Sequence, residues 1–140
     1  MKLFAVALLT MIVNVAMAQT SIVGVWKTMD DETGLAKSHV EIYEQNGKYY
    51  GKVIKILDPN KQNSVCGECD ESDSRYNKKV LGMVIVTGLV KDGDEYTDGE
   101  ILDPNKGEIY DCEMWLENGK LMVRGYIAFF YRTQTWYKVQ

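Results

Sequence analysis

The sequence predicts an all-β protein built as a single antiparallel, up-and-down β-barrel of about eight strands. Aromatic and β-branched residues are common after residue 20. The dipeptides Asn46-Gly47, Asp92-Gly93 and Asn118-Gly119 are typical of two-residue hairpin turns, whose central residues need positive φ. No segment from residue 20 onward keeps a helical period over roughly ten residues.

Segments of apolar or alternating character account for the strands. They are residues 22–28, 38–45, 48–57, 82–90, 95–102, 107–117, 120–128 and 133–139. A meander of this size removes its exposed edges by closing on itself. The interior of an eight-stranded barrel is filled by side chains or holds one small ligand. Large side chains that we expect to point inward are Tyr50, Met83, Tyr110, Met114 and Trp136.

The chain begins with a segment typical of a secretory signal peptide. Lys2 precedes an apolar stretch, and Ala16-Met17-Ala18 fits a signal-peptidase site. The stretch is shorter than the roughly 20 apolar residues of a spanning helix, which makes a retained anchor the weaker alternative. We expect residues 1–18 to be removed and residues 19–140 to form one exported domain, periplasmic or secreted, without a membrane span.

Charge and composition exclude several classes of function. The chain has 16 Lys and Arg against 20 Asp and Glu, and no basic block, so nucleic-acid binding is not expected. A single histidine, His39, and three cysteines leave few ways to build a metal or histidine-based catalytic site. We expect no catalytic residues, no metal and no cofactor.

Two of the cysteines, Cys66 and Cys69, lie in a polar loop at 58–79. In an exported protein the favoured interpretation is a structural disulfide between them. A thiol-redox pair is the second interpretation, although the surrounding carboxylates raise a thiol pKa. The third is a zinc site completed by Cys112 and His39. The alternative pairing of Cys112 with Cys66 or Cys69 stays open.

Trp26 lies in a Gly-x-Trp motif at the start of the first predicted strand. This motif resembles the signature of lipocalin-like barrels, in which the tryptophan closes one end of the barrel. An arginine from the last strands then stacks on the indole ring as a cation–π partner. Arg124 and Arg132 are the candidates for that partner.

A polar patch is expected near the last two strands. Arg124, Arg132 and Gln134 are residues that barrel shape alone does not require. A buried arginine must be paired, and the candidate acidic partners are Asp103 and Glu100.

The aromatic cluster at 129–131 lies at the connection between the last two strands. Exposed aromatic rings at a barrel mouth suit an apolar ligand, and they can equally plug the barrel end. The candidate ligand-binding residues are Trp26, Arg124, Arg132, Gln134, Phe129 and Tyr131.

Several phrases of the sequence together resemble a known family. They are Gly24-x-Trp26, Asn46-Gly47-Lys48-x-Tyr50-Gly51-Lys52-Val53, Leu81-Gly82-Met83, Asp98-Gly99-x-Ile101-x-Asp103-Pro104-x-x-Gly107-x-x-Tyr110, Gly119-Lys120-Leu121-x-Val123-Arg124-Gly125-Tyr126 and Arg132-Thr133-Gln134-Thr135-Trp136. The chain resembles the exported bacterial proteins catalogued as domain of unknown function 2147, and its cysteine loop resembles a Bacteroides-like branch of them. The resemblance implies a lipocalin-like, or calycin-like, β-barrel and implies no activity.

Three functions from different classes are compatible with these observations. The first is non-catalytic binding of a small apolar or amphipathic ligand inside the barrel. The second is an envelope protein–protein interaction module with a filled barrel, whose contact surface is the loop at 58–79 or the aromatic cluster at 129–131. The third is a thiol-redox enzyme that uses the Cys66–Cys69 pair.

Overall fold

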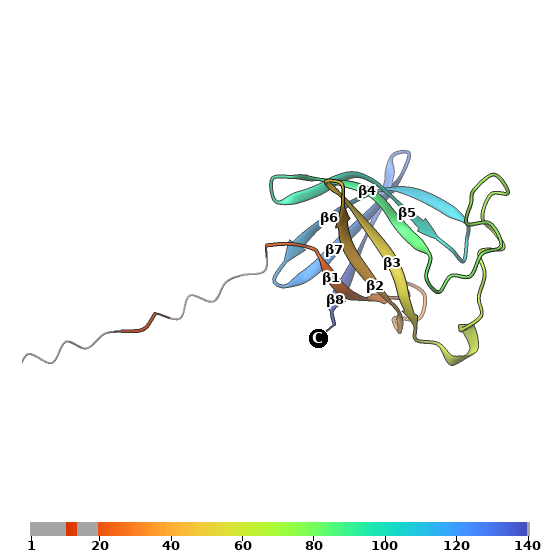
Figure 1. Ribbon diagram of the computed structural model, residues 1–140, viewed down its shortest axis with the longest axis horizontal. Coiled ribbons are helices and arrows are strands. Elements are labelled where there is room, and N and C mark those ends of the chain that lie inside the picture. The colour runs from red at the N-terminus through yellow and green to blue at the C-terminus, as the bar shows by residue number, and fades with distance from the viewer. Residues whose placement is uncertain (1–10, 14–19, 140) are drawn as a thin grey trace, which may run out of the picture.

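The computed structural model describes residues 11–13 and 20–139, and it confirms the predicted antiparallel barrel. Eight strands close in sequence order, β1 through β8, with the last strand beside the first (Figure 1). They are β1 (Gly24–Met29), β2 (Ala36–Gln45), β3 (Lys48–Ile56), β4 (Val84–Asp92), β5 (Glu95–Asp103), β6 (Glu108–Glu117), β7 (Lys120–Ile127) and β8 (Phe130–Lys138). The predicted bounds of every strand fall within three residues of these. The predicted signal peptide, apart from residues 11–13, lies outside the described residues.

Three short hairpins gather at one end of the barrel, which we call the closed end. Asn46-Gly47 and Asn118-Gly119 have positive φ at both residues, as predicted for type I′ turns. The third turn is shifted by one residue from its predicted place. Because Asp92 pairs with Glu95, its central residues are Gly93 and Asp94, and only Gly93 has positive φ.

The closed half of the barrel is filled by large side chains. The residues before β1 cover this end, where the carbonyl oxygen of Ile22 accepts a hydrogen bond of 2.8 Å from Nε1 of Trp26. Both residues are completely buried. The side chains packed with them include Ile42, Leu89, Tyr96, Met114 and Leu121.

Tyr50 does not point into this core, so that prediction is wrong. Its ring stacks on Tyr43 at 5.8 Å between centroids, while the buried neighbour Tyr49 meets the edge of Tyr96 at 4.8 Å. Apolar residues occupy both faces of β3, so alternation alone does not distinguish the inner face from the outer one.

The ladder between β1 and β8 is short and leaves the barrel wall split. It contains two residue pairs, Trp26 with Lys138 and Lys27 with Tyr137. Beyond Lys27, β1 continues to pair with β2 as far as Met29. The part of β8 that precedes Tyr137 therefore has no ladder partner on its β1 side. We call this separation the split seam.

The other end of the barrel, here the open end, carries the remaining four connections, three of which are longer than two residues. They are the β1–β2 loop (30–35), the β3–β4 loop (57–83), the β5–β6 turn (104–107) and the β7–β8 turn (128–129). Figure 1 shows the β3–β4 loop, in green, beside the β5–β6 turn. No helix in the described part of the chain is both long enough and apolar enough to cross a membrane.

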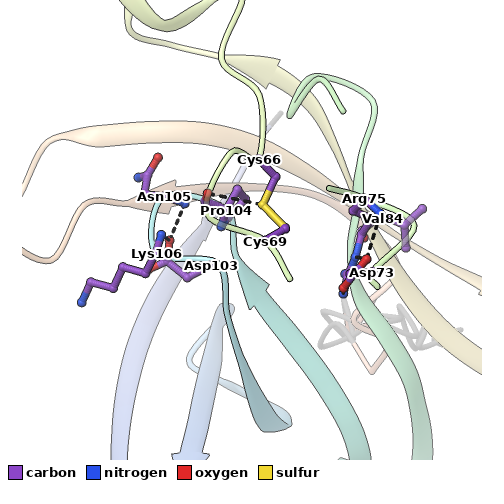
Figure 2. Close-up of a disulfide and its surroundings, with 9 residues drawn as sticks. All are labelled: Cys66, Cys69, Asp73, Arg75, Val84, Asp103, Pro104, Asn105 and Lys106. Carbon is purple, nitrogen blue, oxygen red and sulfur yellow. Dashed lines mark hydrogen bonds and ion pairs between the residues drawn. A yellow bond between two sulfur atoms is a disulfide. The ribbon is translucent and has the colours of Figure 1, made fainter. Parts of the chain in front are cut away.

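A disulfide between Cys66 and Cys69 closes a short ring within the β3–β4 loop, at the place where this loop packs against the β5–β6 turn (Figure 2). Sγ of Cys66 lies 3.5 Å from the carbonyl oxygen of Pro104. A Cβ atom added to Gly107 would fall 1.9 Å from the carbonyl oxygen of Glu68. The pairing alternatives for Cys112 are not realised, because that thiol is free and buried.

A second attachment holds the same loop to β4. The guanidinium of Arg75 donates to Asp73 at 2.8 Å and to the carbonyl oxygen of Val84 at 3.1 Å (Figure 2). The loop is therefore held at two places on the barrel.

Candidate functional site

The open half of the barrel contains a cavity of about 480 Å³. Its apolar walls come from β1, β5, β7 and β8 and include Met29, Ile101, Val123, Ile127 and Trp136. Polar side chains are set among them, namely Thr28, Asp31, Lys37, Ser38, Asp103, Lys106, Tyr110, Arg132 and Gln134. Trp136 is nearly fully buried, so the cavity extends from the mouth to the packed core.

A chain of hydrogen bonds crosses the split seam on the cavity side. Nε1 of Trp136 donates to Oε1 of Gln134 at 3.0 Å. Nε2 of Gln134 donates to the carboxylate of Asp31 at 2.6 Å, and Arg132 donates to the same oxygen at 3.2 Å. These bonds fix the orientation of the Gln134 amide and bring the β1–β2 loop to β8.

Asp103 shapes the opposite side of the mouth. Its Oδ1 accepts from the backbone N–H of Asn105 at 2.9 Å and from that of Lys106 at 3.4 Å. Asp58 makes the equivalent bond to Asn60 at 2.9 Å. The two copies of Ile-Leu-Asp-Pro-Asn-Lys, at 56–61 and 101–106, thus begin their connections in the same way.

Tyr110 lines the cavity as a neutral phenol. Its hydroxyl donates to the carboxylate of Glu108. That hydrogen bond, together with burial, raises the pKa of Tyr110 to about 12. At neutral pH Tyr110 therefore adds a dipole to the wall and no charge.

A second cavity of about 440 Å³ adjoins the first at the open end. It lies between the β1–β2 loop and the start of the β3–β4 loop, and its lining includes Leu35, Ile56 and Val80. Lys37, Ser38 and Pro104 line both cavities. Lys37 is the ionisable residue that the two linings share.

The cation beside Trp26 is not one of the predicted arginines. Nζ of Lys138 lies 4.9 Å from the centroid of the Trp26 ring. This pairing follows from the register, which places Lys138 opposite Trp26 in the β1–β8 ladder. Trp26 is completely buried in the closed half and does not line the open-end cavity.

Arg124 points out of the barrel, because inward and outward side chains alternate along β7 and the preceding residue, Val123, is buried inside. Its guanidinium lies 4.8 Å from the centroid of the Trp115 ring and 4.5 Å from that of Tyr131. It also donates to Thr133 at 2.8 Å. The predicted polar patch is therefore divided: Arg124 lies outside the barrel and Arg132 lies at the cavity.

Arg132 and Gln134, two of the candidate ligand-binding residues, line the cavity. Their acidic partner is Asp31, and the predicted partners Asp103 and Glu100 make no ion pair with Arg132 within 4.0 Å. Asp31 belongs to an acidic run, Asp30-Asp31-Glu32, that follows β1 in the sequence. Only the closed topology places this run beside β8.

The aromatic cluster at 129–131 is also divided. Phe130 and Tyr131 line the cavity mouth, whereas Phe129 is 98% exposed and does not. Phe129 follows Ala128, whose φ of 51° belongs to a tight two-residue turn. The side chain of Phe129, at the tip of this turn, therefore points into solvent.

The cysteines have surroundings that do not favour thiol chemistry. Cys66 and Cys69 are buried as a disulfide. Burial raises the pKa of the Cys112 thiol to about 12, so it stays protonated at neutral pH.

Across the described residues no group of three or more His, Cys, Asp or Glu side chains could hold a metal ion. His39 pairs in the ladders with Lys27 and Lys55.

Comparisons with known proteins support the fold and, separately, identify the family. The structure described as protein HP1028 from the human pathogen Helicobacter pylori, which belongs to the lipocalin family, superposes with a TM-score of 0.76 at 20% identity. The match covers 87% of this chain and 85% of that one. No curated protein matches the sequence. A family model matches residues 24–138, so the chain belongs to the uncharacterized proteins conserved in bacteria that form domain of unknown function family 2147.

Proposed function

We propose that this protein binds one small apolar or amphipathic molecule, without catalysis, in the cavity at the open end of the barrel. The observation that carries the proposal is the uneven filling of the interior. Large side chains occupy the closed half, whereas about 480 Å³ is left in the open half. Ligand pockets in proteins span roughly 300 to 1,000 Å³.

The composition of the walls supports an amphipathic ligand. Ile101, Val123 and Trp136 provide apolar surface, while Gln134 and Arg132 place polar groups at fixed positions. A few oriented polar groups in a mostly apolar cavity are the usual arrangement of a small-molecule site. The similarity to a lipocalin-family structure agrees with this function, although a fold by itself does not determine one.

We further propose that residues 1–18 direct the chain to the periplasm or to the outside of the cell. The disulfide between Cys66 and Cys69 is consistent with an oxidising compartment. The bacterial family agrees with an export route through a signal peptide.

The competing function is an interaction module that uses the β7–β8 turn to bind another envelope protein. It is favoured by the exposure of Phe129 and Phe130, at 98% and 80%. Aromatic side chains this exposed at the tip of a hairpin are typical of contact surfaces. This function does not require an unfilled cavity.

The test is a titration of residues 19–140 with N-phenyl-1-naphthylamine, a neutral apolar probe that fluoresces in apolar surroundings. Val123→Phe should reduce probe affinity at least about tenfold, because the larger ring occupies the cavity. Val90→Phe is the matched control, since Val90 is exposed on β4 and lines no cavity described above. Circular dichroism confirms that both variants fold. Absence of saturable binding, or equal affinity in both variants, would refute the proposal.

A further inference from the structure

Charged side chains at the cavity mouth are not balanced. Three basic residues, Lys37, Lys106 and Arg132, line the cavity with two acidic residues, Asp31 and Asp103. The three basic residues come from three different elements: β2, the β5–β6 turn and β8. They surround one opening although they are far apart in the sequence.

Both acidic groups already have donors. Asp31 accepts hydrogen bonds from Gln134 and Arg132. Asp103 accepts from backbone N–H groups of its own turn. In the part of the chain that the structure describes, neither Lys37 nor Lys106 has a carboxylate within 4.0 Å. Two lysine side chains that line the cavity are thus left without an ion pair among the described residues.

Lys37 has the most informative position. It is partly buried and lines both open-end cavities. Its backbone is fixed by a hydrogen bond of 3.0 Å from the N–H of Leu57 to its carbonyl oxygen. Asp30, an acidic neighbour of Lys37, has a pKa that is lowered chiefly by the backbone N–H groups of Thr33 and Glu32 and least by Lys37. The carboxylate of Asp30 is therefore already hydrogen-bonded within its own turn.

We propose that the ligand is an anionic amphiphile whose head group binds at Lys37, with Arg132 and Lys106 around it. Its apolar part then packs against Ile101, Val123 and Trp136, which line the same cavity. This inference rests on the proposed function and adds the chemical class of the ligand. A carboxylate, a sulfate and a phosphate monoester share the required chemistry.

Physical chemistry favours this class over neutral and cationic ligands. A lysine ammonium donates a charge-assisted hydrogen bond to an anionic head group, and such a bond is about twice as strong as a neutral one. A cationic head group would face Lys37 at short range without a free carboxylate to compensate it. The carboxylate of Asp31 does not oppose the anion strongly, because Arg132 and Gln134 already bind it.

The test compares head groups on one alkyl chain. Dodecanoate, dodecyl sulfate, dodecyl phosphate, dodecanol and dodecyltrimethylammonium each displace N-phenyl-1-naphthylamine from residues 19–140, below their micellar concentrations and at neutral pH. At least one anionic compound should bind about tenfold or more tightly than dodecanol, and the cationic compound should bind most weakly. The ranking of the three anions identifies the preferred head group.

Variants at Lys37 connect this preference to the structure. Lys37→Gln should lose about tenfold in affinity for the preferred anion and leave dodecanol affinity unchanged, and Lys37→Arg should retain most of the preference. Lys48→Gln, on the closed-end hairpin, is the matched control and should bind like the unaltered protein. Equal affinities for anion and alcohol, or no effect of Lys37→Gln, would overturn the inference and leave the proposed function standing. Failure to bind even the neutral probe would overturn both.

Discussion

The carboxylate of Asp31 accepts a hydrogen bond of 2.6 Å from the amide of Gln134, beyond the point where the β1–β8 ladder ends. These residues are 103 positions apart in the chain. A side-chain contact thus holds together a part of the barrel wall that backbone hydrogen bonds do not. The same contact lies at the mouth of the cavity.

Asp31→Ala should loosen the split seam with little effect on global stability. The variant removes partners of Gln134 and Arg132, and the Arg132 side chain is 70% exposed, so we expect a loss of about 1 kcal/mol or less. Hydrogen exchange should become faster in residues 130–135 and unchanged in β3. Glu32→Ala, an exposed change in the same loop, should leave the exchange rates as they are. Unaltered exchange in Asp31→Ala would show that the contact does not hold the seam.

Gly107→Ala should detach the β3–β4 loop from the β5–β6 turn. Gly107 has a φ of 67°, and an added Cβ would collide with the carbonyl group of Glu68. Gly93→Ala is the matched control, because its φ is 62° and an added Cβ meets nothing within 4 Å.

The control separates backbone strain from the collision. Gly93→Ala should lower the free energy of unfolding by about 1 kcal/mol, and Gly107→Ala by about 1 to 3 kcal/mol more. Chemical denaturation measures both values, and limited proteolysis should cut the β3–β4 loop faster only in Gly107→Ala. Equal losses in the two variants would contradict the close packing of Glu68 on Gly107.

Asp73 should contribute a pH-dependent part of the stability. Hydrogen bonds from the Arg75 guanidinium and from the Arg75 backbone N–H lower the pKa of Asp73 to about 2. A lowered pKa stabilises the folded state above the ordinary value of 3.8, and this contribution disappears as the pH falls toward 2.

Asp73→Asn tests that dependence. At neutral pH the variant should be about 1 to 2 kcal/mol less stable than the unaltered protein, and the difference should shrink between pH 4 and 2. Glu71→Gln, exposed in the same loop, should show no such difference. If the stability difference between Asp73→Asn and the unaltered protein persists at pH 2, the Asp73–Arg75 pair is not its source.

Variants at Phe129 and Phe130 should distinguish ligand binding from partner binding. Only Phe130 lines the cavity, so Phe130→Ser should weaken probe binding several-fold while Phe129→Ser should not. Both are highly exposed, so neither change should alter stability by more than about 0.5 kcal/mol. If both variants bind the probe normally, the aromatic turn serves a function other than ligand binding.

The strands and their order could be predicted from local patterns. Turn dipeptides and alternation are properties of neighbouring residues, so they locate each hairpin within a few positions. The turn at Gly93 differs from its predicted place because a local pattern does not fix the strand register. A shift of one residue in the register changes the turn type but leaves the local sequence pattern unchanged.

The composition of the site could be predicted only in part. Arg132 and Gln134 were identified because barrel shape does not require them, but the place of Asp31 beside them depends on how the first and last strands meet. That relationship is set by the register of the β1–β8 ladder, which also places Lys138 on Trp26. No local signal reports the register of strands so distant in sequence.

The most direct test of ligand binding is the native mass of residues 19–140, purified without reductant from a host that exports the protein. We expect a polypeptide lighter by two hydrogens, for the single disulfide, with additional mass that denaturation releases. Val123→Phe should lose this additional mass, and Val90→Phe should keep it. A bare polypeptide mass, unchanged after incubation with dodecanoate, dodecyl sulfate, dodecyl phosphate or dodecanol, would contradict ligand binding in the barrel and leave the interaction module as the better explanation.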